Sequence, residues 1–269
     1  MTLDEFTAER LAELSARVDR HPAVAVCIPS PRPWGLDPAP ARLLAGLILE
    51  LPIRNVLEFG AGHSSLVVAA ALAQRGGGRL TSVEQDPAWC EGDWSSVRRL
   101  RSVDAQLIEA DLHLTLDRRG VYFRLEGANA ALARRAPFDL VLIDAPQYFF
   151  GRDGALHVGW EHLAPGALIL LDDAARSGER RTLRRWLATY PGLELVHVDP
   201  TLGSNGMALL RRGSDPTVRT RAGVLIGSAV SALDGWRRWR DRRRLWQARR
   251  GGVSAGSGSP SQPDAASGR

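Results

Sequence analysis

A strand, a tight glycine turn and a helix are predicted for residues 55–72, and this segment limits the possible folds more than any other. A short apolar run holds Glu58, Gly60-Ala61-Gly62 follows, and Ser64 opens a second apolar run. A turn this sharp favours residues without a Cβ, and bare backbone lets a ligand approach closely. The free N–H groups of the next helix then point above the sheet. The segment therefore predicts the ligand loop of an α/β domain of the nucleotide-binding type.

Strands and helices alternate from residue 55 to residue 211, which predicts a doubly wound α/β sheet. The last two predicted strands are joined by a short Gly-rich loop, and so short a link allows only an antiparallel pair. We therefore expect a seven-stranded, mostly parallel, Rossmann-like sheet with an antiparallel last strand. The expected strands are 55–59, 79–84, 105–110, 138–144, 167–172, 193–199 and 206–211, and the expected helices between them are 64–74, 87–100, 154–163 and 179–190. A small hairpin is expected within 114–125.

Four regions are expected along the chain. The first holds an amphipathic helix and a second helix that Asp37 caps, and it is expected to cover the ligand site as a lid or substrate wall. The last is rich in Gly, Ser, Pro and Ala and is expected to be disordered. The regions are an N-terminal helical cap (1–53), a ligand-binding catalytic domain (54–212), a basic amphipathic helical extension (213–250) and the tail (251–269).

The net charge of +5 is concentrated in the C-terminal part. Residues 213–269 hold 11 Arg and 4 Asp, whereas the rest of the chain holds 24 basic and 26 acidic residues. The charge therefore gives no reason to expect nucleic acid as a partner. The arginine-rich helix, with Trp236 and Trp239 on its apolar face, has two interpretations. It either lies on an anionic membrane or a partner, or it packs on its own domain.

The cysteines and the absence of lysine limit the expected compartment and the expected catalytic groups. Cys27 and Cys90 are far apart in sequence and form neither a disulfide framework nor a zinc signature, so we expect a cytoplasmic protein. No apolar run approaches the roughly 20 residues that span a bilayer, and the acidic start of the chain does not resemble a signal peptide. All 35 basic residues are arginine, so no lysine can act as a base.

Acidic residues follow the predicted parallel strands at the same edge of the sheet. Ligands of doubly wound sheets bind outside the carboxyl ends of the strands, where the strand order reverses. We therefore expect these carboxylates to surround a ligand. They are Glu58, Glu84, Asp111, Asp144, Asp172 and Asp173.

Four segments, taken in order, resemble the motifs of class I S-adenosylmethionine-dependent methyltransferases. They are 57–65 (Leu-Glu-Phe-Gly-Ala-Gly-His-Ser-Ser), 83–84 (Val-Glu), 138–146 (Phe-Asp-Leu-Val-Leu-Ile-Asp-Ala-Pro) and 170–173 (Leu-Leu-Asp-Asp). Within that class they look most like the small-molecule O-methyltransferases of the catechol type. The resemblance covers about residues 54–212. It implies S-adenosylmethionine as cofactor and methyl transfer to a small molecule, at oxygen.

The resemblance also implies a role for each residue near the cofactor. Glu84 would accept the ribose hydroxyls, and Glu58 would orient the loop or the ammonium of the ligand. Asp111 would contact the adenine, with Glu109 as a rival. The backbone of Gly60, Ala61 and Gly62 would make room for the amino-acid portion and the ribose, with His63, Ser64 and Asp144 beside them.

Asp144, Asp172 and Asp173 form a second expected cluster. In metal-dependent relatives such acids bind Mg²⁺ or Ca²⁺, which holds and acidifies a substrate hydroxyl. Alternatively, the adjacent pair caps the next segment or forms ion pairs with Arg176 or Arg180. A divalent cation at the three acids is therefore one of two interpretations.

The general base departs from the family pattern. Metal-dependent relatives often place a lysine three residues after the strand-four aspartate, where this chain has Gln147. His157 is the leading candidate for the base, followed by His162 and His63, because imidazole titrates near neutral pH. Residues 148–150 (Tyr-Phe-Phe) either line a pocket for an aromatic acceptor or pack in the core.

Three other functions remain open from the sequence. A nicotinamide-dependent oxidoreductase is disfavoured because Ser65 stands where that fingerprint has its third glycine. An aminopropyltransferase on the same fold would also suit the acidic site. The third is a non-catalytic binding protein that acts through its basic C-terminal helix. The sequence leaves the acceptor and the oligomeric state open.

Overall fold

A single seven-stranded sheet forms the centre of the computed structural model, which describes residues 6–31, 35–146 and 150–253. The strand order is β3-β2-β1-β6-β7-β9-β8, and β9 runs antiparallel to both of its neighbours. The predicted sheet with an antiparallel last strand is thus confirmed. The strands are β1 (Asn55–Phe59), β2 (Gly78–Glu84), β3 (Val103–Glu109), β6 (Phe138–Ile143), β7 (Leu163–Asp172), β8 (Leu193–Asp199) and β9 (Met207–Arg212).

The two central strands are buried on both faces, which explains their nearly continuous apolar sequences. All five residues of β1 are buried, and in β6 only Asp139 is not. The strands run parallel with Leu57 opposite Val141. Chain order reverses between them, since β1 leads to β2 on one side while β6 leads to β7 on the other. A doubly wound sheet binds its ligand at this reversal point.

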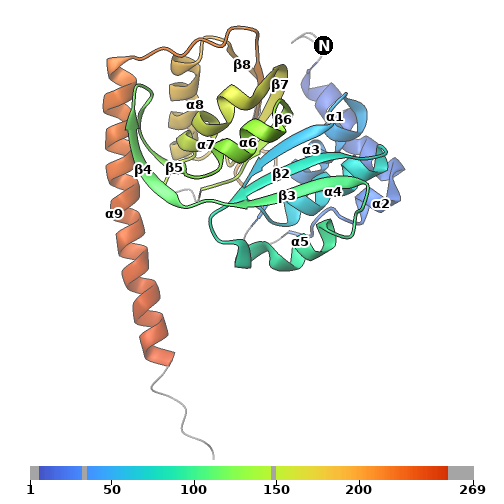
Figure 1. Cartoon of the computed structure of the whole chain (residues 1–269), viewed down its shortest axis with the longest axis horizontal. Helices are drawn as coiled ribbons and strands as arrows, with labels where there is room; N and C mark the ends of the chain where they lie inside the picture. The colour runs from blue at the N-terminus through green and yellow to red at the C-terminus, as the bar shows by residue number, and fades with distance from the viewer. Residues whose placement is uncertain (1–5, 32–34, 147–149, 254–269) are drawn as a thin grey trace, which may run out of the picture.

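Helices cover both faces of the sheet (Figure 1). The N-terminal helices pack with α4 in one apolar cluster, so the predicted cap is continuous with the core on that face. On this face lie α1 (Ala8–Arg17), η2 (Val18–Arg20), α2 (Pro22–Ala25), α3 (Pro38–Glu50), α4 (His63–Gln74), η3 (Pro87–Cys90) and α5 (Glu91–Val97). The other face holds α6 (Asn129–Arg135), α7 (Asp153–Gly159), η4 (Trp160–His162) and α8 (Ser177–Thr189).

The predicted hairpin is present as β4 (Leu112–Asp117) and β5 (Gly120–Leu125), which pair antiparallel. The long helix α9 (Ala222–Val253) packs on β5 through its first turns, where Val224 and Ala232 are buried. Ser228 Oγ accepts the Val121 backbone N–H at 2.9 Å. Beyond this contact α9 continues past the hairpin and away from the domain (Figure 1).

The sequence prediction misses two short helices, α2 and α6, and places several ends differently. The expected helix 87–100 is a 3-10 turn followed by the shorter α5, and strand β7 begins four residues before its predicted start. Helix α6 has only seven residues and two buried apolar side chains, so its periodicity is too short to detect. Within the described part of the chain, none of the helices has the length and apolar character needed to cross a membrane.

Candidate functional site

A cavity of about 570 Å³ opens at the carboxyl ends of the central strands. Its walls come from the loop after β1, from Glu84 at the end of β2 and from the acids after β6 and β7. Residues 35–37 and the loop at 204–205 complete the wall. The segment before α3 is thus the part of the N-terminal region that reaches the cavity, and its role as a lid or substrate wall stays a prediction. The volume lies in the range of pockets that enclose a small organic ligand.

Two glycines shape the loop after β1 for different reasons. Gly60 has φ +98°, and a Cβ there would lie 3.0 Å from the Ala145 Cβ, so this position excludes larger residues. Gly62 has extended backbone, and a Cβ there would meet no atom within 4 Å. Gly60, Ala61, Gly62, His63 and Ser64 all line the cavity. The loop thus fits the predicted role of a bare-backbone cradle.

Glu58 lies behind this loop rather than in the cavity. Its carboxylate is completely buried and accepts hydrogen bonds from Ser64 (2.5 Å), Ser65 (2.5 Å) and Ser82 (2.6 Å). Burial raises the pKa of Glu58 to about 7, although the three hydroxyl donors oppose that shift. Of the two roles expected for Glu58, these contacts support orienting the loop, because they tie the first turn of α4 to the sheet.

Glu84 does line the cavity, and backbone groups fix its carboxylate. Oε2 accepts the Ala61 N–H at 3.0 Å, and Oε1 accepts the N–H groups of Gln85 (2.8 Å) and Asp86 (3.0 Å). Burial raises the pKa of Glu84 against these three donors. A carboxylate held this firmly presents its remaining lone pairs in a defined direction, as an acceptor for ribose hydroxyls requires.

His63 connects the ligand loop to two other segments. Its Nδ1 lies 3.1 Å from Asp93 Oδ1 in α5, and its Nε2 lies 2.9 Å from the Cys27 carbonyl oxygen. Both ring nitrogens therefore have protein partners, although the residue lines the cavity. These contacts make His63 a structural link between the loop, the N-terminal region and α5.

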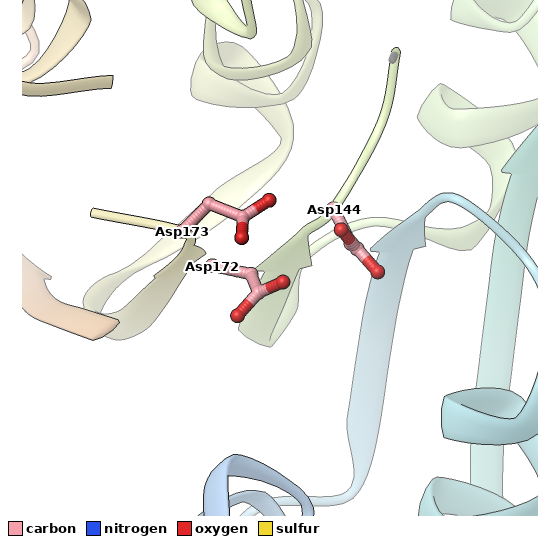
Figure 2. Close-up of side chains that lie close together, drawn as sticks. All are labelled: Asp144, Asp172 and Asp173. Carbon is pink, nitrogen blue, oxygen red and sulfur yellow. The ribbon is translucent and has the colours of Figure 1, made fainter. Parts of the chain in front are cut away.

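Three carboxylates converge at the ends of β6 and β7, as the sequence predicts (Figure 2). Ile143 and Leu171 are opposite each other in the parallel pair, so Asp144 and Asp172 leave the sheet side by side. One oxygen from each of Asp144, Asp172 and Asp173 lies within 4.8 Å of the others. Burial raises the pKa of Asp144 and raises that of Asp172 well above its usual range, and in each case a neighbouring carboxylate adds to the shift.

An arginine that the sequence analysis overlooked enters this cluster. Arg152, in the turn before α7, has 3% of its surface exposed and donates from Nη2 to Asp144 (2.8 Å) and Asp173 (2.7 Å). Arg176 Nη1 lies 2.9 Å from Asp173, so the predicted ion-pair interpretation holds for this residue. The signal available in the sequence is weak, because Arg152 is eight residues from Asp144 and follows no motif.

The candidate bases at 157 and 162 do not line the cavity. His157 is 4% exposed, its Nδ1 lies 2.5 Å from Tyr190 Oη, and its ring packs edge-on against Tyr122. Burial lowers the pKa of His157 to about 3. His162, in η4, is likewise outside the cavity lining. The structure therefore gives His157 a place in the core, outside the cavity in which the predicted general base would act.

Other predicted contacts are placed away from the cavity or outside the described residues. Asp111 is exposed, and neither it nor Glu109 lines the cavity. Phe150 packs against Phe123 with ring centroids 4.9 Å apart, in line with the core interpretation. The predictions for Gln147, Tyr148 and Phe149 lie outside the described residues.

The fold and the cavity define a doubly wound α/β domain with a ligand site at its reversal point. Residues 57–174 match the family model of a methyltransferase domain. This segment contains the glycine loop, Glu84 and the three-acid cluster, and the match identifies an S-adenosylmethionine-dependent methyltransferase. S-adenosylmethionine is its cofactor. No curated protein matches the sequence.

The chain is similar, at low identity, to solved structures that include O-methyltransferases. The cofactor-bound structure of Rv0187 from MTB is 23% identical, with 78% of this chain and 94% of that chain covered and a TM-score of 0.48. The O-methyltransferase TomG from Streptomyces achromogenes, involved in tomaymycin synthesis and solved with its cofactor, is 19% identical. That comparison covers 78% of this chain and 92% of the other, with a TM-score of 0.48. An O-methyltransferase from Thermotoga maritima is 12% identical over 74% and 71% of the two chains, with a TM-score of 0.44.

Proposed function

We propose that this methyltransferase acts on an oxygen atom of a small molecule. The observation that carries the proposal is that one cavity of about 570 Å³ is lined by the glycine loop and Glu84 and also by Asp144 and Asp172. A space of this size suits the cofactor together with a small acceptor better than it suits a polymer. The acidic side of the cavity gives a hydroxyl group several oxygen acceptors to hold it.

S-adenosylmethionine, when bound, supplies an electrophilic methyl group on a sulfonium. The residues of this chain then bind and orient. Glu84 would hold the ribose hydroxyls, and the open space at Gly62 would admit the amino-acid portion. The carboxylates after β6 and β7 would lie near the sulfonium and favour its positive charge. Rate enhancement in such a site comes mostly from aligning the acceptor with the methyl group.

The acceptor is proposed to enter between residues 35–37 and the loop that joins β8 and β9. These two segments are tied by a hydrogen bond in which the Ser204 N–H donates to Asp37 Oδ2 at 2.5 Å. Ser204 and Asn205 line the cavity and offer polar groups to the acceptor. This arrangement favours a polar small molecule that carries a hydroxyl group.

Methyl transfer to a panel of phenols, catechols, aliphatic alcohols and amines tests this proposal. The purified protein is incubated with S-adenosylmethionine, and the methylated atom of each product is assigned by mass spectrometry and NMR. Methylation confined to oxygen supports the proposal, and methylation of amines alone contradicts it. Decarboxylated S-adenosylmethionine with a polyamine acceptor is a separate arm, and aminopropyl transfer there would favour the rival enzyme on the same fold.

We also propose a peripheral contact between α9 and an anionic membrane surface. Ile226, Val230 and Leu233 recur at helical spacing and are exposed, while the first turns of α9 pack on β5 by another face. Arginines are abundant in the rest of the helix, which suits anionic headgroups. The side chain of Trp239 lies outside the described side chains.

Co-sedimentation with phosphatidylserine vesicles tests this contact by comparing the full chain with a chain that ends at Gly235. The shorter chain keeps the turns that pack on β5 and lacks the arginine-rich part of the helix. The full chain should bind the vesicles and the shorter chain should bind them at least about tenfold more weakly, because each arginine near an anionic surface contributes about 1 kcal/mol. Equal binding by the two chains would contradict the proposal.

The working compartment is proposed to be the reducing cytoplasm. Cys27 and Cys90 are both free thiols in the structure. Free thiols persist in a reducing environment. A cell-fractionation experiment with the endogenous protein tests this, and recovery outside the cytoplasmic and membrane-associated fractions would contradict it.

A further inference from the structure

The guanidinium of Arg152 lies where a cation held by the acid cluster would have to lie. One nitrogen, Nη2, is bonded to both Asp144 Oδ1 (2.8 Å) and Asp173 Oδ2 (2.7 Å). The other terminal nitrogen, Nη1, donates to the backbone carbonyl of Asp172 at 2.5 Å. The guanidinium thus contacts all three residues of the cluster.

The donor set suits a hard divalent cation, but the space does not. Mg²⁺ and Ca²⁺ prefer oxygen ligands at roughly 2.0 to 2.6 Å. An ion shared by Asp144 and Asp173 would need nearly the position that Nη2 occupies between them. The three carboxylates fit a cation, therefore, only if the arginine moves out.

Moving Arg152 out is costly. The residue is 3% exposed, so its guanidinium is a buried positive charge that the carboxylates compensate. Separating the guanidinium from these partners would leave that charge uncompensated. Burial alone would lower the pKa of the Arg152 guanidinium, but Asp144, Asp172 and Asp173 outweigh burial and raise it. The side chain therefore stays charged and supplies positive charge to the cluster permanently.

Arg176 adds a second, more exposed positive charge at Asp173, with a distance of 2.9 Å. Its side chain is 36% exposed, whereas that of Arg152 is 3% exposed. The two arginines together offset much of the charge of the three carboxylates.

We propose that Arg152 is the built-in cation of this site and closes the Asp144, Asp172 and Asp173 cluster to divalent metal ions. The carboxylates of the cluster are of the kind that bind a metal ion, but the group that they hold is the Arg152 guanidinium. Removing the arginine side chain opens the cluster and creates a binding site for one divalent cation. This inference concerns metal binding alone and does not depend on which atom is methylated.

Mn²⁺ binding followed by electron paramagnetic resonance tests the proposal directly, because the signal of free Mn²⁺ falls as the ion binds. The wild-type protein is expected to bind no Mn²⁺ at the cluster. Arg152→Ala is expected to bind one Mn²⁺, at least about tenfold more tightly than the weakest binding that the experiment would have detected in the wild type, a change of about 1.4 kcal/mol or more. The double variant Arg152→Ala with Asp144→Asn should lose that site again.

Arg176→Ala is the matched control, because it removes a positive charge from the same cluster and leaves Arg152 in place. It should not create a Mn²⁺ site. Circular dichroism and thermal unfolding of each variant identify those that fold, and Arg152→Met serves if Arg152→Ala does not. Two results would overturn the proposal: stoichiometric Mn²⁺ binding by the wild type that Asp144→Asn abolishes, or no Mn²⁺ binding by a folded Arg152 variant. If neither Arg152 variant folds, stoichiometric Mn²⁺ binding by the wild type at the cluster would still overturn the proposal.

Discussion

Glu58 should make the stability of this protein depend on pH in a direction that is unusual for a carboxyl group. Its side chain is completely buried, and its pKa is raised from 4.5 to about 7, chiefly by burial. The folded state therefore holds a proton more tightly than the unfolded state. The stabilising contribution is fully present below pH 4.5 and is lost as the pH rises through 7.

The substitution Glu58→Gln removes this titration while keeping the shape of the side chain. An amide can still hydrogen-bond to the hydroxyls of Ser64, Ser65 and Ser82, because a hydroxyl both donates and accepts. From the two pKa values, the wild type should lose about 2.5 kcal/mol of unfolding free energy relative to the variant between about pH 5 and pH 8.

Urea unfolding of both proteins at intervals between those pH values measures the difference. Glu91→Gln, at an exposed position of α5, is the control and should track the wild type. A stability gap between wild type and Glu58→Gln that stays constant across the range would refute the reasoning. Such a result would mean that the three serine hydroxyls hold Glu58 ionised despite its burial.

Two further predictions concern the loop and the buried histidine. Gly60→Ala should lower the unfolding free energy by about 1–2 kcal/mol, because residue 60 has a positive φ. Gly62→Val should fold normally but weaken cofactor binding by at least about tenfold, because its side chain would enter open space in the cavity. Equal losses of unfolding free energy in the two variants would contradict this. His157→Phe should cost about 1–3 kcal/mol, because it removes a buried hydrogen-bond partner of the Tyr190 hydroxyl, yet leave kcat/KM of the folded enzyme within about threefold. A fall of about 100-fold or more in kcat/KM would instead identify His157 as the base.

The sequence predicts the sheet and the cofactor loop well because both rest on local patterns. The apolar strands, the glycines at 60 and 62 and the acids at the strand ends are each readable over a few residues. The short hairpin and the antiparallel β9 follow from turn lengths in the same way. Parallel strands then bring the acids together without further information, as the register of β6 and β7 shows.

What the sequence could not predict depends on contacts between distant segments. Arg152 reaches Asp173 across 21 positions of sequence, and no periodicity marks that pairing. His157 has the chemistry of a base, but its burial beside Tyr190 is decided by how α7 and α8 pack. Asp111 follows its strand as expected and still lies outside the cavity lining, because the chain turns there into the hairpin.

Isothermal titration with S-adenosylmethionine and with its demethylated product tests the central claim most directly. The wild type should bind one molecule of either ligand, and Glu84→Gln should weaken that binding by at least about tenfold, because the fixed carboxylate is the proposed ribose acceptor. Glu161→Gln, at an exposed position of η4 outside the cavity lining, is the control and should leave the affinity unchanged. Binding of neither ligand by the folded wild type would contradict the assignment of the cavity as the cofactor site.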